Sequence, residues 1–515
     1  MNIDTRTVNS IRNIGSGLIS QVIYAVLGFV SRTFFIKYLA IEYLGVNGLF
    51  SSILSVLALA ELGVGSAFIY SLYKPLADKN EQLIAAVMAL YKKVYHIIGI
   101  GIFIIGLAIL PFLNHIVTEK PEVITESIAF IYFLFLFNTA SSYFFSYKVS
   151  LINADQRNFI TTINYLGFYV LQNLLQILVL VLFKNFLYYL IVQIVCQFLS
   201  NVSISILANK YYPFLKKFKN LKVNQALIKE LISNTKATFI IKVGGILVNA
   251  TDNLIINFFS GLALVGLASN YYLLIGLAST LIAQVFNNIS SSIAQINTIE
   301  SKEKQYETFK TINFANFWIY GFSAISFVVL ANDFIILWIG QDYVLPLSIS
   351  IIIAVNFFML GVQGTIWTFK STYGFFNQGK YLVLLTALLN LGFSFLLGHY
   401  WGLLGILMAT AIARLLTNFW YDPYIVFKLG LQINPTIYGI RFLKFLGVLL
   451  ISGVSTYIIA KFISFNLILS FIIKTLICLI VPNMIILLMY KNSKDFLSVK
   501  TIALNSYKTL LKNKN

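Results

Sequence analysis

The stretch FNLILSFIIKTLICLIVPNMIILLMY, residues 465–490, decides the fold class, because it is long enough to cross a bilayer and carries a single charged side chain, Lys474. A transmembrane helix needs roughly 20 consecutive, mainly apolar residues. Comparable apolar stretches recur along the whole chain, for example at 97–113, 168–183 and 349–369. The sequence therefore predicts a protein that crosses a membrane many times.

The composition leaves room for little besides membrane spans and short connections. Of the 515 residues, 59% are hydrophobic and 11% are charged, which is typical of a chain that is mostly surrounded by lipid. The predicted fold class is an all-α polytopic membrane protein with about 14 transmembrane helices. We expect the spans near 14–36, 44–70, 94–113, 124–147, 158–183, 186–207, 237–259, 262–295, 311–331, 344–369, 381–398, 402–427, 441–460 and 465–490.

Lysines and arginines gather in alternate gaps between these spans. If the amino terminus is cytoplasmic, the outside segments hold only Lys37, Lys120, Lys184 and Lys461. This asymmetry follows the positive-inside rule and predicts that both termini are cytoplasmic. The net charge of +19 is then explained by basic residues that meet anionic lipid headgroups, so membrane lipids and not nucleic acids are the expected partners.

The two halves of the chain repeat each other. SRTFFI at 31–36 and LGVNGLF at 44–50 correspond to TDNLII at 251–256 and VGLASNY at 265–271, which aligns Arg32 with Asp252 and Gly45 with Gly266. A repeat of six spans predicts two parallel six-helix repeats around an axis along the membrane normal, plus two extra C-terminal helices. The predicted parts are an N-terminal six-helix half (1–208), a cytoplasmic amphipathic linker (209–236), a C-terminal six-helix half (237–427), an extra transmembrane helix pair (428–490) and a basic cytoplasmic tail (491–515).

The same runs resemble a known family. RTFFIKYL at 32–39, EYLGVNGLF at 42–50 and LAELGVG at 59–65 look like the N-terminal pattern of bacterial polysaccharide (Wzx-like) flippases. DNLII at 252–256 and ALVGLA at 263–268 resemble the seventh and eighth spans of these proteins. The family belongs to the superfamily of multidrug, oligosaccharidyl-lipid and polysaccharide exporters, which includes the lipid II flippases.

This resemblance implies a carrier and not an enzyme. Such a carrier moves an undecaprenyl-diphosphate-linked oligosaccharide from the inner to the outer leaflet of the bacterial cytoplasmic membrane by alternating access, for capsule, exopolysaccharide or O-antigen synthesis. It is expected to act as a monomer beside a polysaccharide polymerase and glycosyltransferases, with no metal or cofactor, and coupling to protons or sodium is possible.

Ionisable groups inside the predicted spans are the first candidates for a binding site. Each costs about 2.5–3.5 kcal/mol on insertion scales, so it usually faces a cavity or a partner. Arg32 in span 1 and Lys242 in span 7 are candidates for binding the diphosphate of the substrate. Arg414 in span 12, also a substrate-binding candidate, could extend this cationic surface or lock a gate. Asn249 and Gln284 are further substrate-binding candidates.

Two carboxylates accompany these basic residues. Glu61 and Asp252 are expected to balance their charge or to couple transport to an ion. Other polar side chains that could donate hydrogen bonds to sugars, or could only join helices to one another, are Gln21, Tyr24, Asn47, Gln172 and Asn270.

Less specific interpretations remain open at this point. Arg32 and Lys242 stand near helix ends and could extend to the membrane interface instead, and no role is assigned to Lys474. The alternative function is an ion-coupled small-molecule exporter of the multidrug type. A membrane glycosyltransferase or polymerase is a third, less favoured, since such enzymes usually have a large outward loop and this chain has none.

Overall fold

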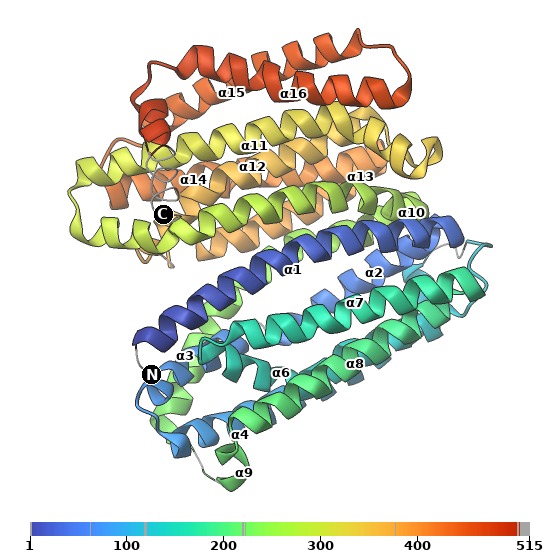
Figure 1. Cartoon of the computed structure of the whole chain (residues 1–515), viewed down its shortest axis with the longest axis vertical. Helices are drawn as coiled ribbons and strands as arrows, with labels where there is room; N and C mark the ends of the chain where they lie inside the picture. The colour runs from blue at the N-terminus through green and yellow to red at the C-terminus, as the bar shows by residue number, and fades with distance from the viewer. Residues whose placement is uncertain are drawn as a thin grey trace, which may run out of the picture. The chain divides into compact units, whose positions relative to one another are not determined.

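The computed structural model describes residues 3–61, 63–117, 121–218, 221, 223–375, 377–501 and 504. Regular secondary structure in this part of the chain is helical throughout, as Figure 1 shows. Contacts divide the chain into two compact units, unit 1 (Met1–Gly266) and unit 2 (Leu267–Asn515). The predicted halves and linker were drawn from the sequence repeat and from charge, and those boundaries stay predictions.

Unit 1 is a bundle in which α1 runs alongside α7, and α7 packs on α8 (Figure 1). Asn80, Ser127 and Asn185 begin three of its helices by accepting a hydrogen bond from the backbone N–H three residues on. Its helices are α1 (Ile3–Tyr38), α2 (Ile41–Leu57), η1 (Ala58–Glu61), α3 (Val64–Ala77), α4 (Glu81–Ile109), η2 (Leu110–Phe112), α5 (Leu113–Ile116), α6 (Ile128–Ala154), α7 (Asn158–Phe183), α8 (Phe186–Tyr211), α9 (Phe214–Lys217) and the part of α10 (Gln225–Ile299) up to Gly266.

Unit 2 is arranged around α11, which packs against α12, α15 and α16. Phe317 of α11 stacks on Phe445 of α15 with ring centroids 4.1 Å apart. Besides the remainder of α10, its helices are α11 (Lys302–Ile339), η3 (Gln341–Tyr343), α12 (Leu347–Thr372), α13 (Lys380–Leu416), α14 (Asn418–Ile425), the π-helical turn η4 (Val426–Leu431), α15 (Thr436–Lys461) and α16 (Leu467–Tyr490).

Eleven helices in the described part of the chain are long and apolar enough to cross a membrane. Two of them contain a kink with non-helical backbone angles, at Gly261 of α10 (φ 78°, ψ 171°) and at Gly402 of α13 (φ 53°, ψ −132°), where glycine adopts the backbone without strain. Each is therefore two of the predicted spans joined by a very short turn. The chain is thus a multi-pass helical membrane protein, and its eleven helices become thirteen segments when these arms are counted separately, one fewer than the 14 predicted spans.

One predicted span differs from the structure. The sequence suggests one continuous helix over 44–70, but the chain is broken there into α2, η1 and α3. Gly63, in the left-handed region at φ 87°, precedes α3. Apolar periodicity could not reveal the break, because the residues on both sides of it are equally hydrophobic. The consequence is that Glu61 lies at the end of η1 and not in mid-helix.

Two glycines let α2 and α10 touch backbone to backbone. A Cβ placed on Gly45 would lie 2.0 Å from the carbonyl oxygen of Leu262, and a Cβ on Gly266 would lie 2.4 Å from that of Ile41. Small residues allow such close approach between membrane helices. Gly266 follows Gly45 by the same number of residues as Leu262 follows Ile41, so the contact is reciprocal.

The final helix is fixed to α11 by polar contacts. Lys474 Nζ lies 2.7 Å from Asp333 Oδ2, and the side chains of both residues are less than one-fifth exposed. The indole N–H of Trp318 donates a 2.7 Å hydrogen bond to Asn483 Oδ1. Lys474, to which the sequence assigned no role, therefore has an acidic partner within unit 2.

Candidate functional site

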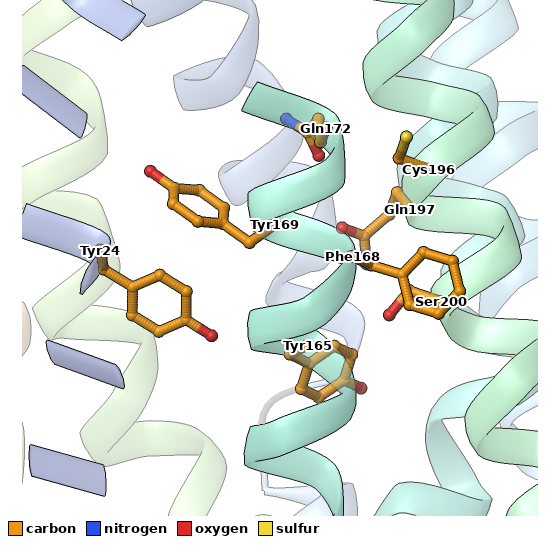
Figure 2. A pocket seen from close by; sticks show the side chains of 8 residues that line it. All are labelled: Tyr24, Tyr165, Phe168, Tyr169, Gln172, Cys196, Gln197 and Ser200. Atoms are coloured by element: carbon orange, nitrogen blue, oxygen red, sulfur yellow. The ribbon is translucent and has the colours of Figure 1, made fainter. Parts of the chain in front are cut away.

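A cavity of about 420 Å³ lies within unit 1 between α1, α7 and α8. Figure 2 shows Tyr24 of α1 to the left of the α7 side chains, and Cys196, Gln197 and Ser200 of α8 to their right. None of the side chains that line it is charged. They are Tyr24, Tyr165, Phe168, Tyr169, Gln172, Cys196, Gln197 and Ser200.

The cavity wall on α7 follows from helical spacing. Residues 165, 168, 169 and 172 recur at intervals that place them on one helix face. Ile163, Leu174 and Leu178 are each more than half exposed, as expected for side chains that meet lipid. Helix α7 therefore separates a wall of phenol and amide groups from an apolar surface.

Aromatic and amide groups of the cavity are held in place by one another. The rings of Tyr24 and Tyr169 are perpendicular, with centroids 4.7 Å apart, a favoured geometry for aromatic pairs. Gln172 Nε2 donates to Gln176 Oε1 at 3.3 Å, and Gln176 Nε2 donates to the carbonyl oxygen of Tyr189 at 3.2 Å. This chain of hydrogen bonds leads from the cavity along α7 to α8.

Arg32 lies beyond the far end of this polar chain. Tyr189 is within electrostatic range of both Arg32 and Tyr169. Arg32 follows Tyr24 by eight residues on α1, a rise of about 12 Å, and Gly28 between them faces the Tyr169 hydroxyl. Unit 1 thus places a half-buried guanidinium along the same helix face as the uncharged cavity.

Glu61 lies in a separate cluster of tyrosines. Tyr95 donates a 2.6 Å hydrogen bond to Glu61 Oε1, and the rings of Tyr91 and Tyr95 meet edge to face at 4.5 Å. A Cβ on Gly65 would lie 2.8 Å from the Tyr95 hydroxyl, so the start of α3 is packed against this cluster. The carboxylate that the sequence proposed for ion coupling is therefore held beside the break between η1 and α3.

The other predicted site residues are distributed over both units. Asp252 is a half-buried residue of α10 in unit 1, next to Asn253, which donates a 3.0 Å hydrogen bond to Ser52 Oγ of α2. In unit 2, Arg414 of α13 is 7% exposed and Gln284 of α10 is half-buried. The side chains of Lys242 and Asn249 lie outside the described residues. Their roles in binding stay predictions.

Sequence reasoning found part of the cavity and missed the rest. Tyr24 and Gln172 were among the polar side chains proposed to contact sugars, and both line it. Tyr165, Tyr169 and Gln197 were not proposed. The spacing of 165, 169 and 172 on one face of an otherwise apolar span was the signal that could have found two of them.

The fold resembles those of solved transporters, although no protein-family model and no curated protein matches the sequence. A lipid II flippase, MurJ, in an inward closed conformation is similar with a TM-score of 0.62 and 14% identity, over 94% of this chain and 99% of that one. An inward-facing multidrug resistance transporter of the MATE family and MOP superfamily is similar with a TM-score of 0.60 and 15% identity, over 77% and 91%. A MATE transporter from Vibrio cholerae, VcmN, is similar with a TM-score of 0.55 and 13% identity, over 81% of this chain and 96% of that one.

The coverage of these likenesses bears on the C-terminal helix pair. The 6% of this chain that the MurJ alignment leaves out is about 31 residues, fewer than the 26 of α15 and 24 of α16 together, so that alignment includes at least part of the pair. The alignment to the MATE transporter leaves out 23% of the chain. The chain therefore has the fold of these solved transporters.

Proposed function

We propose that this protein is a flippase that moves an undecaprenyl-diphosphate-linked oligosaccharide from the inner to the outer leaflet of the bacterial cytoplasmic membrane by alternating access. The observation that carries the proposal is the likeness to a lipid II flippase over 94% of the chain, which reaches into α15 and α16. The resemblance of residues 32–65 and 252–268 to polysaccharide flippases supports the same substrate class.

The chemistry of unit 1 fits such a substrate. A diphosphate cannot enter hydrocarbon without a compensating partner, and the guanidinium of Arg32 suits phosphate oxygens through its fork of donors. Lys242 would add a second positive charge from α10. In this proposal Glu61 or Asp252 responds to a proton or sodium gradient that drives the cycle.

A measurement of leaflet distribution tests the proposal. In cells depleted of this protein, undecaprenyl-linked oligosaccharide is probed with a label that reaches only the outer face of the membrane. We expect complete oligosaccharides to accumulate out of reach of the label. Normal outward exposure in depleted cells would contradict the proposal.

Two substitutions test the diphosphate contacts. We expect Arg32→Ala and Lys242→Ala each to lower export by roughly 10- to 150-fold, since a hydrogen bond to a charged group is worth roughly 1.5–3 kcal/mol and each 1.4 kcal/mol is about a factor of ten. Membrane insertion should be unaffected, because removing a charge from a span favours insertion. Lys37→Ala, which removes an exposed charge at the end of α1, is the matched control and should export normally. Normal export in the first two variants would remove the diphosphate site.

The second candidate is an ion-coupled exporter of small molecules, and the likeness to MATE transporters is the observation that favours it. Cationic drugs are best held by carboxylates, and none of the eight residues that line the unit 1 cavity is acidic. Drug susceptibility of the depleted cells distinguishes the candidates. Increased susceptibility with normal surface polysaccharide would favour the exporter.

A further inference from the structure

We infer that the cavity between α1, α7 and α8 is a saccharide subsite, which holds sugar rings of the substrate while Arg32 takes the attached diphosphate. This inference rests on the proposed function. It goes further in one respect, because it assigns recognition of the whole headgroup to unit 1 alone.

The lining of the cavity matches the two kinds of surface that a sugar presents. A pyranose has apolar C–H faces and a rim of hydroxyl groups. The rings of Tyr24 and Tyr169 offer flat apolar surfaces. The amide of Gln197 can both donate and accept, and Gln172 Oε1 can accept while its Nε2 donates to Gln176. Ser200 Oγ accepts from Asn164 Nδ2 at 3.0 Å. Small-molecule sites in proteins combine an aromatic lining with a few polar groups in this way, and 420 Å³ lies within their usual range of volumes.

Other occupants fit the cavity less well. A polyprenyl or acyl chain would deprive its phenols and amides of hydrogen-bond partners, which is costly in a water-poor site. A cation would find aromatic rings but no carboxylate among the eight lining residues, and Arg32 farther along α1 would repel it. A neutral, hydroxyl-rich ligand is the class that satisfies the groups present.

The spacing along α1 also suits a sugar linked to diphosphate. Tyr24 and Arg32 are about 12 Å apart along the helix axis, with Gly28 between them. Gly28 leaves the wall open, because a Cβ there would meet only the Tyr169 hydroxyl, at 3.8 Å. The sugar end and the phosphate end of one headgroup can therefore follow the same helix face.

The test compares two lipids bound to the full-length protein in nanodiscs. The probes are undecaprenyl diphosphate and the lipid-linked oligosaccharide extracted from the membranes of depleted cells. We expect the wild type to bind the glycosylated lipid more tightly, and Tyr24→Leu and Tyr169→Leu each to weaken this lipid about tenfold while leaving undecaprenyl diphosphate unchanged. Arg32→Ala should weaken both lipids. Tyr188→Leu is the matched control, because Tyr188 of α8 is 51% exposed and outside the cavity.

The outcomes separate the subsite from the proposed function. If the wild type binds neither lipid, the flippase proposal falls. If it binds both but the tyrosine variants keep the preference for the glycosylated lipid, or lose affinity for both lipids equally, only the saccharide subsite falls.

A second measurement uses the wild-type cavity and needs no substitution within it. Cys196 lines the cavity, and Cys478 is the other cysteine of the chain. In a Cys478→Ser protein, the glycosylated lipid should slow alkylation of Cys196 by a small maleimide severalfold, and undecaprenyl diphosphate should not. Cys196 is 2% exposed, so its alkylation is first measured without lipid, and equal rates with the two lipids in a protein whose Cys196 does react would overturn the inference.

Discussion

Replacing Gly45 by alanine should strain the contact between α2 and α10 more than any side-chain rearrangement can relieve. The added Cβ would lie 2.0 Å from the Leu262 carbonyl oxygen, and Cβ atoms essentially never approach closer than 3.0 Å, so the helices must separate by about 1 Å. Overpacking of this kind costs roughly 1–3 kcal/mol. Because a helix backbone cannot rotate away as a side chain can, we expect a cost at the upper end of this range, about 3 kcal/mol. The better helix propensity of alanine offsets about 1 kcal/mol of that cost. We expect a net loss of about 2 kcal/mol in the free energy of unfolding.

The assay is reversible unfolding in mixed micelles titrated with SDS. Gly101→Ala is the matched control, because Gly101 lies within α4 and nothing is within 4 Å of its Cβ position. We expect this control to be neutral or to gain up to about 1 kcal/mol. Gly266→Ala should behave like Gly45→Ala, since its Cβ would lie 2.4 Å from the Ile41 carbonyl oxygen. Equal unfolding free energies for Gly45→Ala and Gly101→Ala would refute the backbone contact.

Two further predictions concern polar contacts within each unit. Tyr95→Phe removes the 2.6 Å hydrogen bond to Glu61 and should lower the free energy of unfolding by about 1.5–3 kcal/mol. Tyr70→Phe, at a 63% exposed residue, should change nothing, and equal effects would contradict the assigned bond. Lys474→Met leaves Asp333 without its 2.7 Å partner and should cost about 2–3 kcal/mol, most of which Asp333→Leu in the same chain should recover. An SDS titration measures both, and a double variant no more stable than the single one would count against the ion pair.

The sequence predicts the fold well because apolar length and charge asymmetry are properties of each span taken separately. The fold class follows from stretches such as 465–490, and the correspondence between Gly45 and Gly266 follows from the sequence repeat. What it could not predict depends on neighbours across helices. The break at η1 has no apolar signature, and nothing in the pattern around Lys474 indicates that Asp333, on another helix, is its partner.

The candidate site shows the same division. Charge within a predicted span was enough to select Arg32 and Glu61, since an ionisable group in lipid needs an explanation. Their surroundings were beyond the sequence, because whether a tyrosine faces a carboxylate or a cavity depends on helix rotation. Tyr95 therefore emerged only in the structure, beside Glu61, and Tyr169 only beside Tyr24.

The reciprocal glycine contact also suggests the evolutionary history of the chain. In a homodimer with two-fold symmetry, residue i of one subunit touches residue j of the other, and j touches i in return. Gly45 meets Leu262 while Gly266 meets Ile41, which is this pattern within a single polypeptide. A half-length ancestor that dimerised in parallel through one glycine, followed by gene duplication and fusion, would leave such a contact, and the two glycines would be remnants of a subunit interface that became part of one chain.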